Sequence, residues 1–198
     1  MNYLAHFLLS AGNADLIVGN FIADDVKGKK YLQYPKGIQN GIIMHRAIDD
    51  FTDSHPVVGQ SKKLIRKHQQ KFTPVVMDIL YDYFLATNFH HYSQEDLLPF
   101  SKKTYQILNS RFDILTPKTK YILHYMQKNN WLYNYSTVDG IKRALTGMSQ
   151  RTPYQNNMHV AHHLLNDFHG ELLDDFKVFY PELHQFVKNI ENKSFNFS

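Results

Sequence analysis

The stretch that organises this chain is Gly41-Ile42-Ile43-Met44-His45-Arg46-Ala47-Ile48-Asp49-Asp50-Phe51-Thr52-Asp53. Neighbouring residues of an α-helix are turned by about 100°, so Ile42, His45 and Asp49 would share one narrow stripe. Ile38 extends the apolar part of that stripe by one more turn. Because a buried carboxylate without a partner is costly, a stripe that passes from isoleucine to histidine and aspartate predicts a positive group beside His45 and Asp49. A hydrogen bond between these two side chains within the helix is the alternative explanation.

The composition predicts one globular domain over residues 1–198. A chain of 198 residues is long enough for a sizeable core, and 43% hydrophobic and 20% charged residues are typical of a folded protein. The 13 tyrosines and 14 phenylalanines suit a helical core with large side chains. The absence of cysteine excludes disulfides and thiolate metal sites, so a bound metal would need histidine, carboxylate or water ligands.

The charge and hydropathy patterns argue against several classes of partner. A net charge of +4 permits an acidic protein partner, but it is no signature of nucleic-acid binding. No apolar run reaches the roughly 18 residues of a membrane span. The apolar N-terminal stretch carries His6 and lacks a basic leading segment, so we interpret it as part of the fold and not as a signal peptide. We therefore expect a cytoplasmic protein that binds neither nucleic acid nor a membrane.

Apolar residues recur at helical spacing along the chain, and there is no long alternating β pattern, internal repeat or low-complexity linker. The expected fold is a single compact all-α domain. Capping residues are expected at Asp15, Thr73 and Thr137, and a capping box at residues 93–96. Pro181 is expected to kink or split the last helix. Helices are expected over residues 2–10, 15–28, 35–52 and 57–70, then from positions 73, 97, 117 and 137, and finally over 155–168 and 171–191, with a loop over 29–34.

The helix expected from Thr73 carries a second unusual pair of polar residues. Asp78 and Asp82 lie one turn apart on a side that also carries Leu85 and Phe89. Like charges at this spacing repel each other, and in apolar surroundings one of them would have to be neutralised. A bound cation would relieve both effects.

Two further polar residues border apolar faces of the expected helices. For His6, a hydrogen-bonded core histidine is the stronger local interpretation, and for Asp24 a helix cap or an ion pair with Lys27 is equally plausible. Taken together with the His45/Asp49 and Asp78/Asp82 pairs, one or two histidines and several aspartates suit Mn²⁺, Mg²⁺ or another divalent ion. Such an ion supports hydrolysis at phosphorus, whereas no Gly-x-Ser-x-Gly or Walker motif is present.

Basic residues could serve this chemistry at the rim of the site. Arg46 follows His45 and could reach the same site, while Lys27, Arg143 and Arg151 are candidates for phosphate or partner contacts. A surface ion pair is the alternative for each of them. Two clusters are interpreted as surface features, the first also as a docking patch for an acidic partner: Lys62, Lys63, Arg66 and Lys67, and the histidines at positions 159, 162, 163 and 169.

In their order and spacing, several segments resemble the bacterial acyl carrier protein phosphodiesterases, also called acyl carrier protein hydrolyases. The resemblance covers nearly the whole chain and implies an all-helical fold distantly similar to the HD-domain metal phosphohydrolases. It also implies dependence on a divalent cation, preferably Mn²⁺. The segments are residues 1–6, 19–28, 41–53 with the His-Arg-x-Ile-Asp core at 45–49, 77–85, 131–132 and 147–151.

The resemblance implies a reaction in lipid metabolism and fatty acid biosynthesis. Members of the family hydrolyse the phosphodiester between 4′-phosphopantetheine and a serine of holo-acyl carrier protein, an acidic helical protein, and release apo-carrier and 4′-phosphopantetheine. A nucleotide or another small phosphodiester is the alternative substrate, and a non-catalytic module that binds acyl carrier protein is the alternative without an enzyme. Carried over residue by residue, the resemblance implies metal ligands at His45, Asp49, Asp24 and Asp82, ligands or supporting residues at His6 and Asp78, and catalytic roles for Asp24, His45, Asp49 and Arg46.

Overall fold

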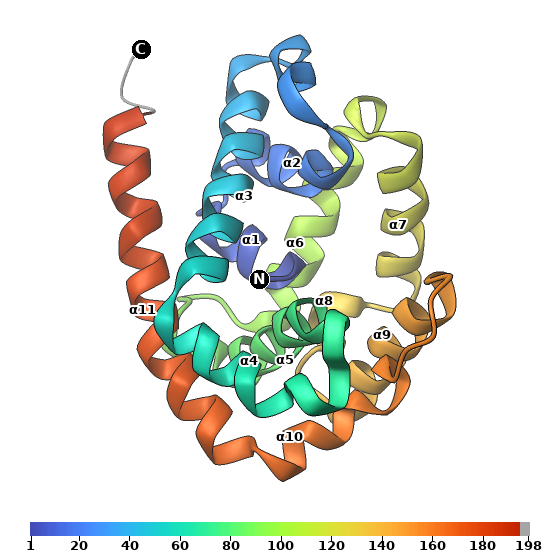
Figure 1. Cartoon of the computed structure of the whole chain (residues 1–198). Helices are drawn as coiled ribbons and strands as arrows, with labels where there is room; N and C mark the ends of the chain where they lie inside the picture. Colours follow the sequence, from blue (N-terminus) through green and yellow to red (C-terminus); the bar gives the residue numbers. More distant parts are fainter. Residues whose placement is uncertain (195–198) are drawn as a thin grey trace.

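Helix α3 (Lys36–Ser54) contains the organising stretch, and its buried stripe includes Ile38, Ile42, His45 and Ile48. The computed structural model describes residues 1–194, and over this range the chain is helical and without strands. Figure 1 shows α3 running beside the C-terminal helix, with the other helices arranged around the N-terminus. The prediction of an all-α domain is confirmed. The α-helices are α1 (Tyr3–Leu9), α2 (Ala14–Ile22), α3, α4 (Pro56–Gln69), α5 (Thr73–Thr87), α6 (Leu97–Ser110), α7 (Pro117–Lys128), α8 (Trp131–Asn134), α9 (Val138–Arg151), α10 (Leu164–Asp167) and α11 (His169–Ser194).

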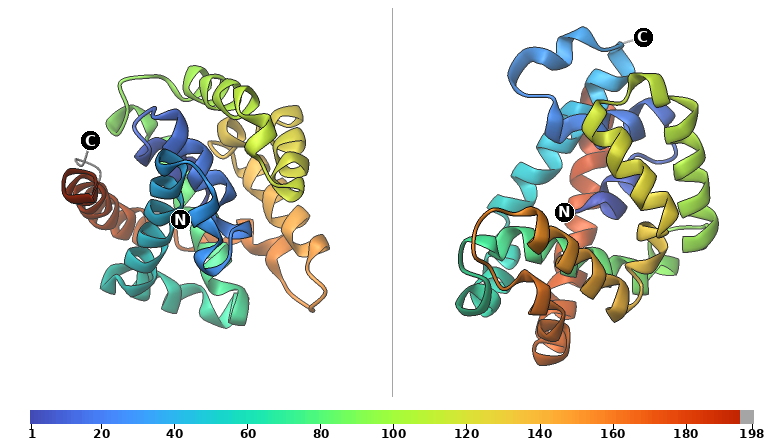
Figure 2. Two further views of the ribbon diagram at one scale, coloured as in Figure 1. Left: turned by 90° about the horizontal axis from the view of Figure 1, so that it is seen from above. Right: turned by 90° about the vertical axis from the view of Figure 1, so that its right-hand side faces the viewer.

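Helix α1 forms the centre of the structure. Five of its seven residues are buried, including His6, and it packs against α2 and α5. Both views of Figure 2 place the N-terminus in the middle of the surrounding helices. The N-terminal segment is therefore part of the core, as the sequence analysis expected, and it brings His6 close to α3.

Helices α2 and α3 pack closely because each presents a glycine where they meet. A Cβ atom on Gly41 would lie 2.6 Å from the carbonyl oxygen of Leu16 and 2.8 Å from the Cα of Gly19. A Cβ atom on Gly19 would in turn overlap the backbone of α3 at Ile38 and Gly41. These two glycines therefore set the distance between the helices one turn before His45.

The helix starts agree with the predictions in part. Thr137 accepts a hydrogen bond from the Gly140 amide and caps α9, as predicted. The predicted cap at Asp15 is wrong, because the side chain of Asn13 accepts from the amides at positions 15 and 16. Thr73 lies inside α5 and donates to the Gln70 carbonyl, so it is no cap either. The predicted capping box also fails, since α6 begins after residue 96 without a side-chain cap.

Two segments differ from their predicted conformation. Residues 28–33 form a 3₁₀ helix (Gly28–Gln33) where a loop was expected, and residues 23–25 form another (Ala23–Asp25) where α2 was expected to continue. The helix predicted over 155–168 is wrong, because the chain forms the 3₁₀ helix Met158–His163 followed by the short α10. Its buried Met158, Ala161 and Leu164 recur every third residue, which is the period of a 3₁₀ helix.

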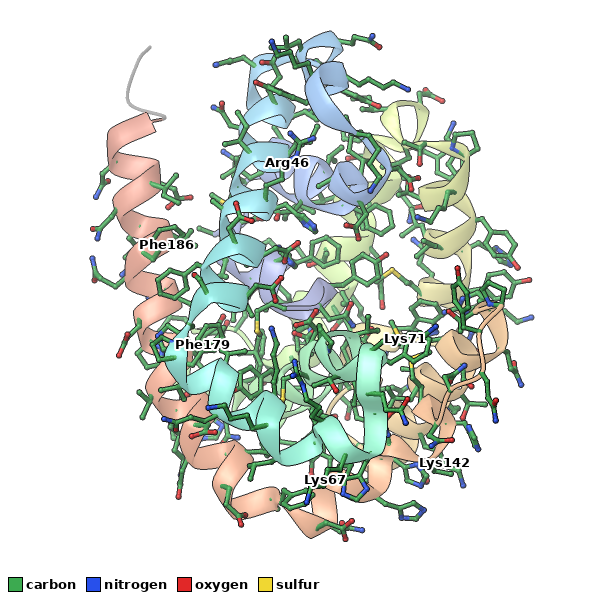
Figure 3. The ribbon with its side chains drawn as sticks, in the orientation of Figure 1. Arg46, Lys67, Lys71, Lys142, Phe179 and Phe186 are labelled. Carbon is green, nitrogen blue, oxygen red and sulfur yellow. The ribbon has the colours of Figure 1, made fainter. Side chains whose placement is uncertain are left out.

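The C-terminal helix stays continuous across Pro181 and is not split. Buried side chains on both sides of the proline, including Phe179 and Leu183, hold the helix against its neighbours. Figure 3 shows Phe179 and Phe186 directed from α11 towards α3. Of the histidines expected at the surface, His162 is buried and the other three are exposed. Within the described residues, no helix combines the length and apolar character needed to cross a bilayer.

Candidate functional site

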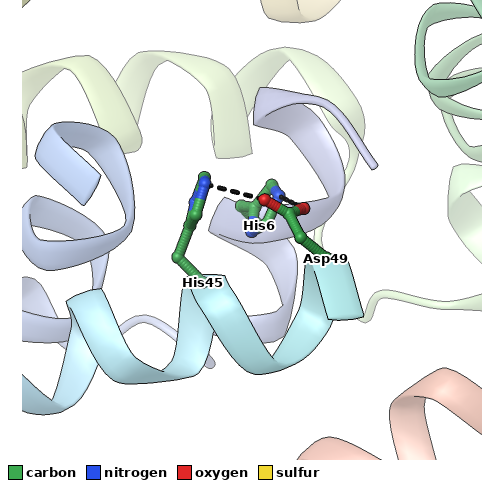
Figure 4. Close-up of side chains that lie close together, drawn as sticks. All are labelled: His6, His45 and Asp49. Atoms are coloured by element: carbon green, nitrogen blue, oxygen red, sulfur yellow. Dashed lines mark ion pairs between the residues drawn. The ribbon is translucent and has the colours of Figure 1, made fainter. Parts of the chain in front are cut away.

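The site contains His6 from α1 together with His45 and Asp49 from α3. Figure 4 shows the two histidines next to each other, each joined to the aspartate by an ion pair. The Nε2 atom of His6 lies 3.2 Å from Oδ1 of Asp49, and the Nε2 atom of His45 lies 3.1 Å from Oδ2. The two imidazole rings stack with their centroids 4.1 Å apart. One ligand atom from each residue lies within 4.8 Å of the others, so the three side chains could hold one metal ion.

The tautomer of His6 is fixed by Asn20, a buried residue of α2. The amide nitrogen of Asn20 donates to Oγ of Ser10 and to the Leu16 carbonyl, which directs its oxygen at Nδ1 of His6, 3.0 Å away. Nδ1 must therefore carry the proton. Burial, together with the neighbouring positive charge of His45, lowers the pKa of His6 to about 4, so the ring is neutral at pH 7.

A neutral His6 with its proton on Nδ1 leaves a lone pair on Nε2. That atom faces two further electron-rich atoms, Oδ1 of Asp49 at 3.2 Å and the carbonyl oxygen of Met1 at 3.3 Å. With the proton on Nδ1, His6 has none on Nε2 to share with these oxygens, so a cation between them would relieve their repulsion. The arrangement therefore fits a divalent ion bound by imidazole nitrogen and carboxylate oxygen.

His45 lies between two carboxylates, its Nε2 3.1 Å from Asp49 and 3.5 Å from Asp24. Burial alone would lower the pKa of His45, but the two carboxylates outweigh it and raise this pKa to about 9. The intrahelical pair that was the alternative to a cation site is therefore present. His45 would have to lose its proton before its Nε2 could bind a metal.

The structure separates the roles of the two adjacent aspartates at positions 24 and 25. The Asp24 side chain is 67% exposed and lies beside His45, whose hydrogen bond holds the pKa of Asp24 below its usual value. Asp25 accepts a hydrogen bond from Thr116 and pairs with Lys118 at 2.7 Å. Asp24 thus borders the site, and Asp25 connects the segment that carries both aspartates to the start of α7.

The two aspartates of α5 contact the start of α1. Oδ1 of Asp78 lies 3.1 Å from the amino group of Met1, which is itself 3.8 Å from Asp49. Asp82 is fully buried and accepts a hydrogen bond of 2.8 Å from the Leu4 amide. Burial raises the pKa of Asp82 to about 7. Asp78 therefore lies next to the site, whereas the structure does not place Asp82 in the metal-ligating group of His6, His45 and Asp49.

The predicted basic residues have three different environments. Arg46 donates through Nη2 to the carbonyls of Val26 and Gly28, and it stacks over Tyr31. It therefore fixes the segment that carries Asp24, and the structure does not support its predicted place beside the reacting group. Lys27 is exposed, while Arg143 and Arg151 line a pocket next to α1.

The sequence analysis missed Asn20 and, apart from Arg143 and Arg151, the residues of this pocket. Asn20 is a polar residue among the buried apolar residues of α2, and this was the signal that could have identified it. The pocket lies between α7, α8 and α9 and also includes Tyr3. No local pattern marks its residues, because they come from four helices.

Comparison with known proteins identifies the family. The family model described as acyl carrier protein phosphodiesterase matches residues 1–183. The chain is 30% identical to the protein of that name from Enterobacter sp. (strain 638), over 96% of this chain and 98% of that protein. It is 28% identical to the protein of the same name from Photorhabdus laumondii subsp. laumondii, over 98% of both chains. No solved structure matches, so kinship with the HD-domain enzymes stays a prediction. The chain belongs to the acyl carrier protein phosphodiesterase family.

Proposed function

We propose that the protein hydrolyses the phosphodiester between 4′-phosphopantetheine and a serine of holo-acyl carrier protein, which yields apo-carrier and 4′-phosphopantetheine. The observation that carries the proposal is the convergence of His6, His45 and Asp49, whose ligand atoms lie within 4.8 Å of one another. Family membership and the names of the relatives supply the substrate class.

His6, His45 and Asp49 would hold a divalent ion, and Mn²⁺ suits their mixture of nitrogen and oxygen donors. When bound, such an ion activates a water molecule and offsets charge on the phosphoryl oxygens. Asn20 keeps the His6 lone pair directed at the ion by holding the proton on Nδ1.

Asp24 is the side chain best placed to take up a proton during the reaction. It is exposed, lies 3.5 Å from His45 and is ionised at neutral pH, and the hydrogen bond to His45 lowers its pKa further. A carboxylate at this position can accept a proton from an attacking water molecule. Arg143 and Arg151 would contact the non-bridging phosphate oxygens through charge-assisted hydrogen bonds.

The charge of the protein agrees with an acidic protein substrate. The net charge is +4, and exposed cations occur on α4, including Lys63 and Lys67. Figure 3 shows Lys67 at the edge of the molecule. Complementary charge speeds the association of two proteins and helps to orient them.

The test is incubation of the purified protein with holo-acyl carrier protein and Mn²⁺, followed by intact-mass measurement of the carrier. Loss of the phosphopantetheine mass is expected, and a chelator should prevent it. Asp49→Asn should abolish the reaction, while Asp50→Asn, an exposed neighbour on the same helix, should retain it.

An unchanged carrier mass with folded, Mn²⁺-loaded protein would refute the proposal. Turnover of free nucleotides in the same assay would favour the alternative of a small phosphodiester substrate. Binding of the carrier in the presence of chelator without any turnover would favour a binding module.

A further inference from the structure

A pocket of about 600 Å³ lies between α7, α8 and α9. Its walls are mainly apolar and aromatic, with Tyr3, Ile122, Trp131 and Met148 among the lining residues. Both the volume and the apolar lining with a few polar groups are typical of sites for small molecules, which span roughly 300–1,000 Å³. The three metal-ligating side chains do not need a cavity of this size to bind an ion.

Two residues that line the pocket also lie close to residues of the candidate metal site. Tyr3 lines the pocket and lies on α1, one turn before His6. Lys118 also lines the pocket and pairs at 2.7 Å with Asp25, the neighbour of Asp24. A group held at the metal site is therefore next to the pocket.

A second contact joins the pocket to the start of the chain. The hydroxyl of Tyr135, a lining residue, accepts a hydrogen bond of 2.8 Å from the Asn2 side chain. The amino group of the preceding residue, Met1, lies 3.8 Å from Asp49. The pocket and the metal-ligating group thus share the N-terminal segment as a common wall.

Two arginines give the pocket an affinity for negative charge. Arg143 and Arg151 line it from positions about two turns apart on α9. Among the described residues, neither forms an ion pair with a carboxylate. Unpaired guanidinium groups beside apolar walls fit a ligand with an anionic end and a slender, largely uncharged body. Guanidinium groups bind phosphate with two parallel hydrogen bonds.

We propose that this pocket binds the pantetheine arm of the substrate, with Arg143 and Arg151 at its phosphate end. The inference rests on the proposed function. A phosphodiester at the metal site has two substituents, and the carrier protein on the serine side is far too large for the pocket. The arm is a narrow chain with methyl and amide groups, which match the aromatic walls and the side-chain amides of Asn129 and Asn134.

Trp131 allows a direct test of this inference, because it is the only tryptophan in the chain and lines the pocket. Titration with D-pantetheine, which has no phosphate, should change the Trp131 emission in a saturable way without any metal. Ala144→Phe, which places a ring in the pocket, should abolish that change. Unfolding of this variant would be visible by circular dichroism, and the titration of the unmodified protein does not depend on it.

A matched pair of variants on α9 tests the phosphate end. Arg143→Ala and Lys142→Ala each remove one positive charge from neighbouring positions, but only Arg143 lines the pocket. Figure 3 shows Lys142 near the edge of the molecule. Arg143→Ala should raise the KM for holo-carrier at least about tenfold, since one lost charged contact is worth about 1.4 kcal/mol or more. Lys142→Ala should leave this KM unchanged.

The outcomes separate this inference from the proposed function. If the unmodified protein cleaves holo-carrier but D-pantetheine leaves Trp131 emission unchanged, the pocket assignment is wrong and the proposed function stands. If decanoate changes the emission and D-pantetheine does not, the pocket binds hydrocarbon and the inference is also wrong. If holo-carrier is not cleaved with Mn²⁺ bound, the proposed function itself fails.

Discussion

The contact between α2 and α3 makes a testable prediction about Gly41. In Gly41→Ala, the new Cβ atom would lie 2.6–2.9 Å from backbone atoms of Leu16 and Gly19. Ordinary van der Waals contacts begin near 3.4 Å, so the helices would have to separate by several tenths of an ångström. Backbone atoms cannot swing aside as the end of a side chain can. The substitution therefore loosens the core along α2 and moves the turn that carries His45.

Two effects of opposite sign determine how much Gly41→Ala changes the free energy of unfolding. Overpacking a core typically costs 1–3 kcal/mol, and the upper part of this range applies because the obstructing atoms are backbone. Replacing glycine by alanine within a helix stabilises it by about 1 kcal/mol. The expected net loss in the free energy of unfolding is about 2 kcal/mol.

Gly59 is the matched control, because a Cβ atom built on it would meet no atom within 4 Å. Gly59→Ala should stabilise the protein by roughly 0.5–1 kcal/mol through helix propensity alone. Urea denaturation followed by circular dichroism would measure both variants against the unmodified protein. If Gly41→Ala were as stable as Gly59→Ala, the close contact of the two helices would be refuted.

Three further predictions concern single side chains. Asp82 has a folded-state pKa of about 7 and an unfolded value near 3.8. The folded chain therefore binds the extra proton between these values, so Asp82 by itself should lower the stability by roughly 4 kcal/mol as the pH rises from about 4 to 7. His6, whose pKa is lowered to about 4, gives the opposite trend over this range, so the difference in urea midpoint between the unmodified protein and Asp82→Asn should change with pH; a difference that is independent of pH would contradict the assignment. Asn20→Ala should weaken Mn²⁺ binding by about 10–100-fold in calorimetric titration, because His6 loses the partner that sets its tautomer, whereas unchanged affinity would exclude this role. Thr137→Ala should cost about 1 kcal/mol of stability by loss of the α9 cap, while Ser93→Ala, which caps no helix, should cost less than half as much.

The sequence predicted the features that depend on spacing within one helix. The period of apolar residues in residues 38–52 places His45 and Asp49 on one stripe of α3, and in the structure the buried His45 lies 3.1 Å from the half-buried Asp49. The same reasoning identified the all-α fold and the Thr137 cap. Predictions failed where another residue competed for the same role, as Asn13 does with Asp15. They also failed where apolar spacing changed from the α-helical to the 3₁₀ period.

Only the tertiary structure decided which distant residues meet. Every candidate aspartate bordered an apolar face in the sequence, so local pattern could not distinguish Asp24 beside His45 from Asp82 beneath the start of α1. Nor could it show that Arg46 binds backbone carbonyls while Arg143 lines a pocket.

The physical reason for this division is that helix period and contact between helices have different origins. The period follows from backbone geometry, so it can be recognised from the order of residues within one helix. Contact between helices depends on how closely they pack, which here is set by Gly19 and Gly41. The sequence by itself determined the stripe with His45 and Asp49 and the family of the chain, and the packing of α1 against α2 and α5 brought His6 to that stripe.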